Sequence, residues 1–285
     1  MRPFEIAKPS TLKEAVELLD SEDPSIRPIG GGTALMLMMK SGLFVPRLLI
    51  SLQETERFLR FISIDQNGSL KIGALASLRK LEKSDLAPAV VRRTMKTLSN
   101  VRVRNVATIG GSLAHADPHM DLPPVLISLG ASVDVVGPQG GRTIGLDSLY
   151  KSYYETTLAK DELISFVSIP PLKEVRAAYK KVTTRSVDDW PALGVAVAFS
   201  DEENEITEAK IVLSAATETP TRLKAAESVL MGAKINETIL QKASDAAADE
   251  AQLVGDPQGS AAYKRELLRV TIRRAVRAAQ YNGVE

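Results

Sequence analysis

The sequence predicts an α+β protein of two domains, and three observations support this prediction. The chain has 285 residues, of which 44% are hydrophobic, and this is enough material for two cores. Pro170-Pro171 interrupts the pattern of segments and is the best candidate for a domain boundary. After it, strand-like segments come first and helical segments follow, and this segregation is typical of α+β folds.

The first domain begins with a helix and a glycine segment. Thr11 to Glu14 has the pattern of a capping box, and the apolar positions that follow it predict a helix. In the segment 27–42 (RPIGGGTALMLMMKSG), a short strand runs through three glycines into an apolar stretch of helical character. We therefore expect a glycine loop at the start of a helix.

A second glycine element occupies 105–137 (NVATIGGSLAHADPHMDLPPVLISLGASVDVVG), about 80 positions after the first. Within it, Asp121 is expected to cap a helix that runs to Leu129. Between the two glycine elements, the pattern predicts strands near 47–52 and 69–73 and an amphipathic helix over 87–99. One bound molecule could touch both glycine elements.

The second domain has a simpler pattern. Alternating or apolar segments at 192–200 and 206–216 flank a polar turn, which predicts an antiparallel hairpin. Three helical segments follow, one at 220–231, one capped by Asn236, and one over 260–280. This domain is therefore expected to combine an antiparallel sheet with a helical bundle.

Composition and charge exclude several classes of function. With 36 basic and 35 acidic residues the net charge is +1, so no overall field favours nucleic acid or an anionic membrane surface. The absence of cysteine excludes disulfides, thiolate zinc sites, a cysteine nucleophile and a cysteine-ligated iron–sulfur cluster in this chain. No run approaches the roughly 20 apolar residues of a membrane helix, and the start lacks a secretory pattern, so we expect a cytoplasmic protein without a membrane span.

The two glycine elements are the most informative feature of the sequence. Glycines let the backbone approach a ligand closely, and successive N–H groups at a helix start form an anion site, or nest. We expect one nest at Gly30 to Thr33 and another at Thr108 to Ser112, a pair that suits a pyrophosphate between two nucleotide halves. The alternative is that both are tight turns. Neither matches the G-x-G-x-x-G or P-loop fingerprint, so Rossmann and P-loop folds are disfavoured.

Several motifs, in order and spacing, resemble the FAD subunits of the xanthine dehydrogenase and aerobic carbon monoxide dehydrogenase family, the molybdenum hydroxylases. The resemblance covers nearly the whole chain. Its motifs are RPIGGGTALMLMMK (27–40), KIGALASLRKLE (71–82), RNVATIGGSLAHADPHMDLPPVLISLGA (104–131), YYETTLAKDELISFVSIP (153–170), AYKKVTTRSVDDWPALGVAVAF (178–199) and AAYKRELLRVTIRRAV (261–276).

The resemblance implies a PCMH-like FAD-binding domain over 1–170, in two parts at about 1–56 and 57–170, and a C-terminal domain over 171–285. It implies non-covalent FAD that receives electrons from a molybdopterin site through two [2Fe–2S] clusters and passes them to an external acceptor. The molybdopterin and the clusters are expected only on partners, a large molybdopterin-binding subunit and a small [2Fe–2S] subunit, in a dimer of heterotrimers. No residue of this chain is expected to perform substrate chemistry.

By position, the resemblance assigns both glycine elements to main-chain contacts with the FAD diphosphate and neighbouring groups. Asp121 falls where the family often has an aspartate that reaches the flavin nucleotide, and Leu35 falls where an apolar residue packs against it. Two residues depart from the family pattern, since Ala34 replaces a polar residue and Ser112 replaces asparagine. The residues assigned to the cofactor are Gly30, Gly31, Gly32, Thr33, Ala34, Leu35, Thr108, Ile109, Gly110, Gly111, Ser112, Asp121 and Lys181.

The only two histidines lie in the second glycine element and admit two interpretations. His115, Asp117, His119 and Asp121 have the spacing of a metal site with nitrogen and oxygen ligands, on one face of an extended strand. Pro118 interrupts that strand, and the segment leads from a glycine loop into a helix cap. We therefore expect cofactor-lining loop residues and no metal.

Trp190, the only tryptophan, lies in a segment that resembles the flavin-facing loop of the family. It could cover the isoalloxazine ring of the flavin, or it could plug a domain interface as a core residue. Lys181 and Arg185 are candidate charge partners for a reduced flavin. On the last helix, Arg265, Arg269, Arg273 and Arg277 recur every four residues, and we favour a solvated face over a contact with an acidic partner.

Two other functions stay open at this point. A self-contained flavin oxidase would need its own substrate pocket and a general base beside the flavin, and both histidines lie in one cofactor loop. A nucleotide-binding scaffold or regulator would use the same glycine elements without redox turnover.

Overall fold

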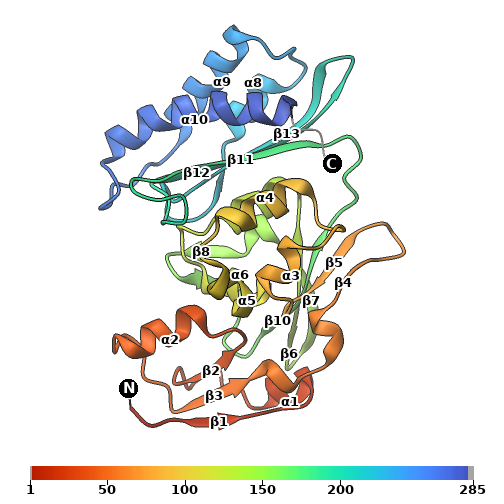
Figure 1. Cartoon of the computed structure of the whole chain (residues 1–285), viewed down its shortest axis with the longest axis vertical. Coiled ribbons are helices and arrows are strands. Elements are labelled where there is room, and N and C mark those ends of the chain that lie inside the picture. The colour runs from red at the N-terminus through yellow and green to blue at the C-terminus, as the bar shows by residue number, and fades with distance from the viewer. Residues whose placement is uncertain (1, 282–285) are drawn as a thin grey trace.

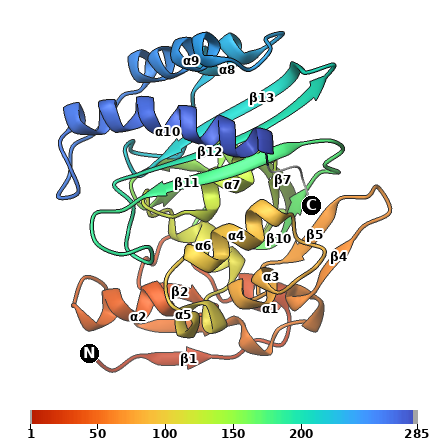
Figure 2. The same cartoon turned by 45° about the horizontal axis from the view of Figure 1, so that its top comes forward.

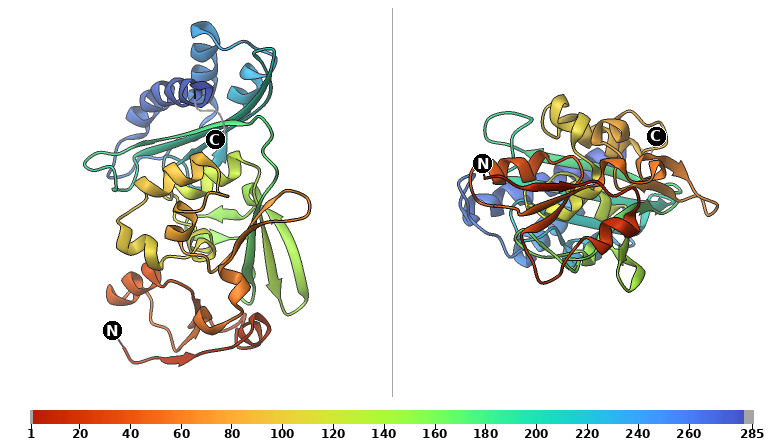
Figure 3. Two further views of the ribbon diagram at one scale, coloured as in Figure 1. Left: turned by 45° about the vertical axis from the view of Figure 1, so that its right-hand side comes forward. Right: turned by 90° about the horizontal axis from the view of Figure 1, so that it is seen from below.

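A computed structural model describes residues 2–281 as an elongated stack of three parts (Figure 1). The N-terminal part lies at one end, a helix-rich middle part follows, and a sheet with its own helices forms the other end (Figure 3). Each part is built around its own sheet. In the C-terminal part the long strands precede the long helices, so the predicted α+β class is confirmed.

The N-terminal part is a small parallel sheet with two helices. Its elements are β1 (Glu5–Ala7), α1 (Leu12–Glu17), β2 (Ile26–Ile29), α2 (Thr33–Lys40) and β3 (Leu48–Ser51). The strands pair in the order β1-β3-β2, and parallel neighbours need crossover connections, which α1 and α2 provide. The Thr11 hydroxyl accepts a hydrogen bond from the Glu14 N–H at 3.1 Å, so the predicted cap of the first helix is confirmed.

The middle part is a five-stranded antiparallel sheet with helices packed against it. Its strands pair in the order β4-β5-β10-β6-β7, with β10 at the centre. A short hairpin of β8 and β9 follows β7. Its main elements are β4 (Ile62–Ile64), β5 (Leu70–Gly73), α3 (Leu78–Glu82), α4 (Ala89–Thr97), α5 (Val101–Val106), α6 (Ile109–His115), α7 (Leu122–Ser128), β6 (Ser132–Gly137), β7 (Gly140–Gly145), β8 (Tyr150–Ser152), β9 (Glu155–Thr156) and β10 (Leu163–Ile169). The predicted amphipathic helix over 87–99 is therefore α4.

The C-terminal part is a four-stranded antiparallel sheet in the order β11-β12-β13-β14, covered by three helices (Figure 2). Its elements are β11 (Arg176–Val182), β12 (Leu193–Glu202), β13 (Glu205–Ser214), β14 (Thr221–Arg222), α8 (Lys224–Leu230), α9 (Glu237–Glu250) and α10 (Ala261–Tyr281). The predicted hairpin is β12 with β13, and its turn holds Glu203 and Asn204 at positive φ. Asn236 accepts from the Ile239 N–H at 3.0 Å and caps α9 as predicted.

Strand β12 is buried on both faces, which explains its nearly unbroken apolar sequence. Val195 and Val197 belong to the core beneath the three C-terminal helices. Ala196 and Ala198, which alternate with them, belong instead to the core of the middle part. Small side chains on this face let the sheet lie close to α4 and α7, so the middle and C-terminal parts share a packed boundary.

Candidate functional site

The first glycine element joins β2 to α2 and leaves main-chain donors open. Gly32 precedes α2 with φ 69° and ψ 4°, a left-handed conformation that favours glycine. The first hydrogen bond of the helix runs from the Met36 N–H to the Gly32 carbonyl at 2.9 Å. Among residues 2–281, the five N–H groups from Gly31 to Leu35 find no acceptor. The predicted nest therefore exists at this element.

The second glycine element differs from its prediction. Its N–H groups are already hydrogen bonded, so they do not form a second open nest. Thr108 caps α6, and its hydroxyl accepts from the Gly111 N–H at 3.2 Å, while its carbonyl accepts from the Ser112 N–H at 2.9 Å. The Ile109 and Gly110 N–H groups donate to the carbonyls of Ala76 and Ala74, at 3.0 and 2.9 Å. The segment after β5 thus uses the donors that the sequence pattern had assigned to a ligand.

The fold brings the two glycine elements into direct contact. A Cβ atom added to Gly31 would lie 2.2 Å from the Val106 carbonyl oxygen, and one added to Gly30 would lie 2.9 Å from the Thr108 hydroxyl. No side chain tolerates 2.2 Å from a main-chain carbonyl oxygen, so Gly31 is needed for the close approach, whereas a Cβ at Gly30 would force the Thr108 hydroxyl to shift. The expectation that one molecule could touch both elements is therefore consistent with the fold.

Gly110 and Gly111, two neighbouring glycines of the second element, differ in how much room their surroundings leave for a side chain. Gly110 is buried, and an added Cβ would lie 2.7 Å from the Ala74 Cβ, so packing alone explains this glycine. Gly111 is exposed, and an added Cβ would meet only the Thr108 hydroxyl, at 2.9 Å. Gly111 adopts a helical conformation, so backbone strain does not require glycine there. Its surface is open to the close approach of a ligand.

The remaining residues assigned to this region are distributed unevenly. Thr33, Ala34 and Leu35 form the first turn of α2 and are half-buried. Ile109 has no exposed surface, so its side chain belongs to the core of the middle part. The Ser112 hydroxyl is buried and faces the Met120 sulfur at 3.7 Å. Open donors and exposed main chain thus concentrate at the start of α2 and at Gly111.

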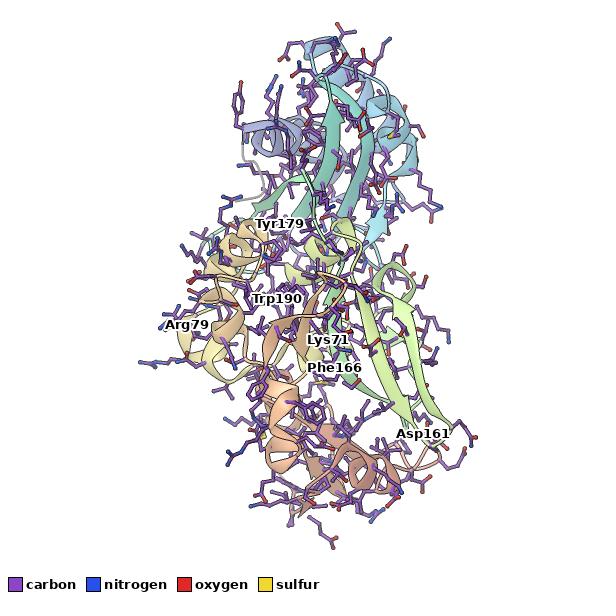
Figure 4. The ribbon with its side chains drawn as sticks, turned by 90° about the vertical axis from the view of Figure 1, so that its right-hand side faces the viewer. Lys71, Arg79, Asp161, Phe166, Tyr179 and Trp190 are labelled. Atoms are coloured by element: carbon purple, nitrogen blue, oxygen red, sulfur yellow. The ribbon has the colours of Figure 1, made fainter. Side chains whose placement is uncertain are left out.

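Asp121 does not cap α7, so this expectation was wrong. It lies before the helix in a right-handed conformation and makes no side-chain cap. Its carboxylate turns instead toward β11, where it accepts from the Tyr179 hydroxyl at 2.6 Å and from the Lys181 ammonium at 2.8 Å. Tyr179 lies where the four-stranded sheet meets the helices of the middle part (Figure 4). Burial raises the pKa of Asp121, and the Lys181 charge opposes this rise.

Lys181, expected to serve the cofactor, is therefore committed to this junction. Besides its ion pair with Asp121, its ammonium donates to the Thr97 carbonyl at the end of α4, at 3.2 Å. Arg185 pairs with Asp189 on the exposed loop between β11 and β12. Tyr179 was not identified from the sequence as a site residue. Its position two residues before Lys181, on the same face of the strand, is a signal that could have indicated it.

The histidine segment forms a network that crosses the same boundary. His119 Nδ1 lies 3.2 Å from Asp117 Oδ1, and His119 Nε2 lies 3.1 Å from Asp256 Oδ2, in the turn before α10. The His115 ring packs instead against Tyr154. Within residues 2–281, no three His, Cys, Asp or Glu side chains are arranged to hold a metal ion. Asp117 and His119 thus contact each other, whereas His115 and Asp121 lie apart from them with other partners.

Trp190 lies on the surface, with 58% of its area exposed, so its interpretation as a core residue was wrong. Its indole stacks on the His119 ring, with ring centroids 5.7 Å apart and planes inclined by 15°. The loop between β11 and β12 thereby rests on the histidine segment of the second glycine element. This placement agrees with the alternative in which Trp190 faces a ligand.

The arginines of the last helix contact helix α9 of the same chain, and this differs from the expected solvated face. Arg269 pairs with Asp245, and Arg277 pairs with Glu237. Arg273 donates to the Gln241 side chain, and Arg265 donates to the Ala248 carbonyl. The stripe therefore joins two helices, and its acidic partners lie within the chain.

The open N–H groups lie at the start of a helix, beside an exposed glycine, and nucleotide-binding proteins use such main-chain donors to bind anions. Residues 2–172 match the family described as FAD binding domain in molybdopterin dehydrogenase, and residues 177–279 match the CO dehydrogenase flavoprotein C-terminal domain. The chain therefore belongs to the FAD-binding subunit family of the molybdenum hydroxylases. It is an FAD-binding component of an oxidoreductase of this type.

Similar proteins span the whole chain. The carbon monoxide dehydrogenase medium chain of Hydrogenophaga pseudoflava is 30% identical, over 97% of this chain and 96% of its own. The nicotine 6-hydroxylase medium subunit of Paenarthrobacter nicotinovorans is also 30% identical, over 95% of both chains. A chain of the solved carbon monoxide dehydrogenase of H. pseudoflava, in a form that lacks the Mo-pyranopterin moiety, superimposes with a TM-score of 0.93 over 98% of both chains at 30% identity. No helix within residues 2–281 is long and apolar enough to cross a membrane.

Proposed function

We propose that the chain holds FAD where its two glycine elements meet and serves as the electron-transfer subunit of a molybdenum hydroxylase complex. One observation carries this proposal, namely the five open N–H groups from Gly31 to Leu35 beside the exposed Gly111. Open donors at a helix start favour a diphosphate, because the partial positive charge of the helix adds to the hydrogen bonds. The exposed Gly111, which carries no side chain, leaves room for that diphosphate.

The two elements would contribute differently to the cofactor. Gly30 to Leu35 would supply main-chain donors, and Thr108 to Ser112 would supply a close, side-chain-free surface around Gly111. Asp121 and Lys181 would act indirectly, since their pair fixes β11 against α7 and so holds the loop that carries Trp190. Trp190 would cover the flavin ring, which its exposure and its place beside the second element support.

FAD, when bound, supplies the redox chemistry, because it accepts electrons in pairs or singly and returns them to an acceptor. The rest of the complex would carry the molybdopterin and the [2Fe–2S] clusters, on a large and a small subunit, in a dimer of heterotrimers. Relatives named for carbon monoxide and for nicotine match this chain over 97% and 95% of its length. That supports a substrate site outside this subunit. A cytoplasmic location is part of the same proposal.

The arrangement of the sheets also supports a division of the chain into domains. We propose an FAD-binding domain over 1–170, divided near residue 56, and a C-terminal domain over 171–285. The parallel sheet ends with β3 and the five-stranded sheet begins with β4, on either side of residue 56. The segment between β10 and β11 contains Pro170-Pro171, and the first family match ends in it, at residue 172.

The proposal is tested by purifying the chain alone and together with its co-expressed neighbours. We expect FAD, not FMN, to be released by acid precipitation, and we expect its colour to bleach on photoreduction and return with an artificial acceptor dye. Oxidation of aldehydes, purines or carbon monoxide should need the neighbours and their molybdenum. Substrate turnover by the lone chain would favour the self-contained oxidase, and a flavin that a reductant does not bleach would favour the non-redox scaffold.

A further inference from the structure

His119 joins three segments of the chain through its ring. Nδ1 faces the Asp117 carboxylate on its own segment, and Nε2 faces the Asp256 carboxylate in the turn before α10. The ring face lies against the Trp190 indole. A neutral imidazole has one N–H and can donate to only one of these carboxylates, whereas the protonated ring donates to both. The geometry therefore fits the imidazolium form.

The two carboxylates are held in place independently of His119. Asp256 Oδ2 accepts from the Lys264 ammonium at 2.7 Å, and Lys264 is fully buried and also donates to the Ala215 carbonyl. Asp117 accepts from the Tyr154 hydroxyl at 3.3 Å. The cluster holds two carboxylates, Asp117 and Asp256, and one permanent cation, Lys264. Its net charge is therefore zero only when His119 is protonated. The neutral ring leaves one excess negative charge in a largely buried cluster.

The Trp190 loop contacts this cluster and the turn beside it at two places. The loop connects β11 to β12, and its Thr184 hydroxyl donates to the Gln258 side chain at 2.9 Å, in the same turn that holds Asp256. A cation against the face of an indole is attracted by the ring electrons, and this attraction ends when the cation loses its proton. The loop is therefore held by Gln258 in the 256–259 turn and by the His119 ring.

We infer that protonated His119 is a positioning residue that seats Trp190 on the second glycine element, and that loss of this proton releases the Trp190 loop. The hydrogen bond with Asp117 raises the pKa of His119 above its ordinary value of 6.5, although burial of the ring opposes this. If Trp190 covers the flavin as proposed above, access to the flavin depends on the same proton. The other titratable or charged groups around this cluster are His115, Tyr153, Tyr154, Lys264, Arg185 and Asp189.

The chain carries its own reporter for this inference, because Trp190 is its only tryptophan. Protonated imidazole in contact with indole quenches its fluorescence, so the full chain without FAD should brighten as pH rises, with a midpoint above 6.5. His119→Gln should remove the step. Asp256→Asn should lower the midpoint by roughly one pH unit, because a nearby opposite charge is lost. Trp190→Phe supplies the tyrosine background.

Asp245→Asn is the matched control, since it also removes a carboxylate from an ion pair, but on α9 and away from His119. It should leave the midpoint unchanged. A flat titration in the wild type, or a step that survives in His119→Gln, overturns the inference. Circular dichroism at each pH separates release of the loop from unfolding.

The link to the flavin needs a separate measurement on the FAD-loaded chain. The rate at which a dye reoxidises the photoreduced protein should rise across the same pH range, and His119→Gln should make that rate high and independent of pH. A fluorescence step without a change in dye rate supports the role of His119 in positioning Trp190 but refutes the proposed cover over the flavin. The two proposals can therefore fail separately.

Discussion

The Asp121 carboxylate and the Lys181 ammonium lie 2.8 Å apart across the boundary between the middle part and the four-stranded sheet, with side-chain exposures of 5% and 8%. Tyr179 and the Thr97 carbonyl complete their hydrogen bonding. A buried pair of this kind contributes little net stability compared with two apolar groups, but removal of one partner leaves an uncompensated charge. The pair therefore fixes how the two parts fit together.

Lys181→Met should lower the free energy of unfolding by about 3–5 kcal/mol near neutral pH, because the buried Asp121 carboxylate loses its counter-charge. Burial raises the pKa of Asp121, so a carboxyl without Lys181 takes up a proton more readily. A carboxyl whose pKa is higher in the folded than in the unfolded state stabilises the fold at pH values below its unfolded pKa of 3.8. This stabilisation is lost as the pH rises through the folded pKa. The destabilisation should accordingly shrink as the pH is lowered. Urea unfolding at several pH values measures both effects.

The exposed pair of Lys151 and Glu155 provides the control for that experiment. Its side chains are 64% and 52% exposed, so Lys151→Met should change the free energy of unfolding by no more than about 1 kcal/mol. The double variant Lys181→Met with Asp121→Asn should recover part of the loss, since no buried charge is left unpaired. Equal losses from Lys151→Met and Lys181→Met would show that the buried pair has no special role.

The arginine stripe of α10 should stabilise the packing of α9 in proportion to burial. Arg269 is 24% exposed and contacts Asp245, whereas Arg277 is 42% exposed and pairs with the exposed Glu237. We expect Arg269→Ala to cost about 1 kcal/mol and Arg277→Ala a few tenths, as surface pairs usually do. The thermal midpoints of the two variants, measured at low and high salt, provide the comparison. A larger loss from Arg277→Ala would contradict this order.

The sequence was most informative where a pattern is local. Caps at Thr11 and Asn236, the hairpin of β12 with β13 and the glycine loop before α2 all depend on neighbouring residues, and each was predicted. Contacts between segments that are distant in the sequence were not predicted. The Asp121 carboxylate accepts hydrogen bonds from Tyr179 and Lys181 and does not cap the nearer helix end. The Gly110 N–H donates to the Ala74 carbonyl and is not free for a ligand. Local spacing carries no information about such partners, because they are brought close only by the packing of whole elements.

His119 should make stability depend on pH in a defined direction. Its contacts with Asp117 and Asp256 raise its folded pKa above 6.5. The protonated ring therefore stabilises the fold fully below 6.5, and this contribution is lost as pH rises through the raised value. Wild-type protein should lose stability across that interval, and His119→Gln should lose less. Unfolding in urea on both sides of the interval tests this, and parallel curves for the two proteins would be inconsistent with a protonated His119.

Adjacent glycines at the start of α6 allow a matched comparison of binding and folding. Gly110 packs on Ala74, so Gly110→Ala should destabilise the fold by about 1–3 kcal/mol through overpacking. Gly111 is exposed and helical, and a side chain there would meet only the Thr108 hydroxyl, at 2.9 Å, which must shift to make room. Gly111→Val should leave the thermal midpoint of the FAD-free chain within a few degrees of wild type, yet abolish retention of FAD, because its methyl groups occupy the surface proposed for the diphosphate.

The two variants should therefore separate in a plot of flavin occupancy against the stability of the FAD-free chain. Gly110→Ala is expected to lose stability and to keep much of its FAD at low temperature, because its main chain still borders the site. Gly111→Ala should be intermediate, since one methyl group meets only the Thr108 hydroxyl. Flavin absorbance per protein after gel filtration gives the occupancy, and thermal unfolding of the stripped protein gives the stability. Full FAD occupancy in Gly111→Val would remove the second glycine element from the site and leave the start of α2 as the sole candidate for the diphosphate.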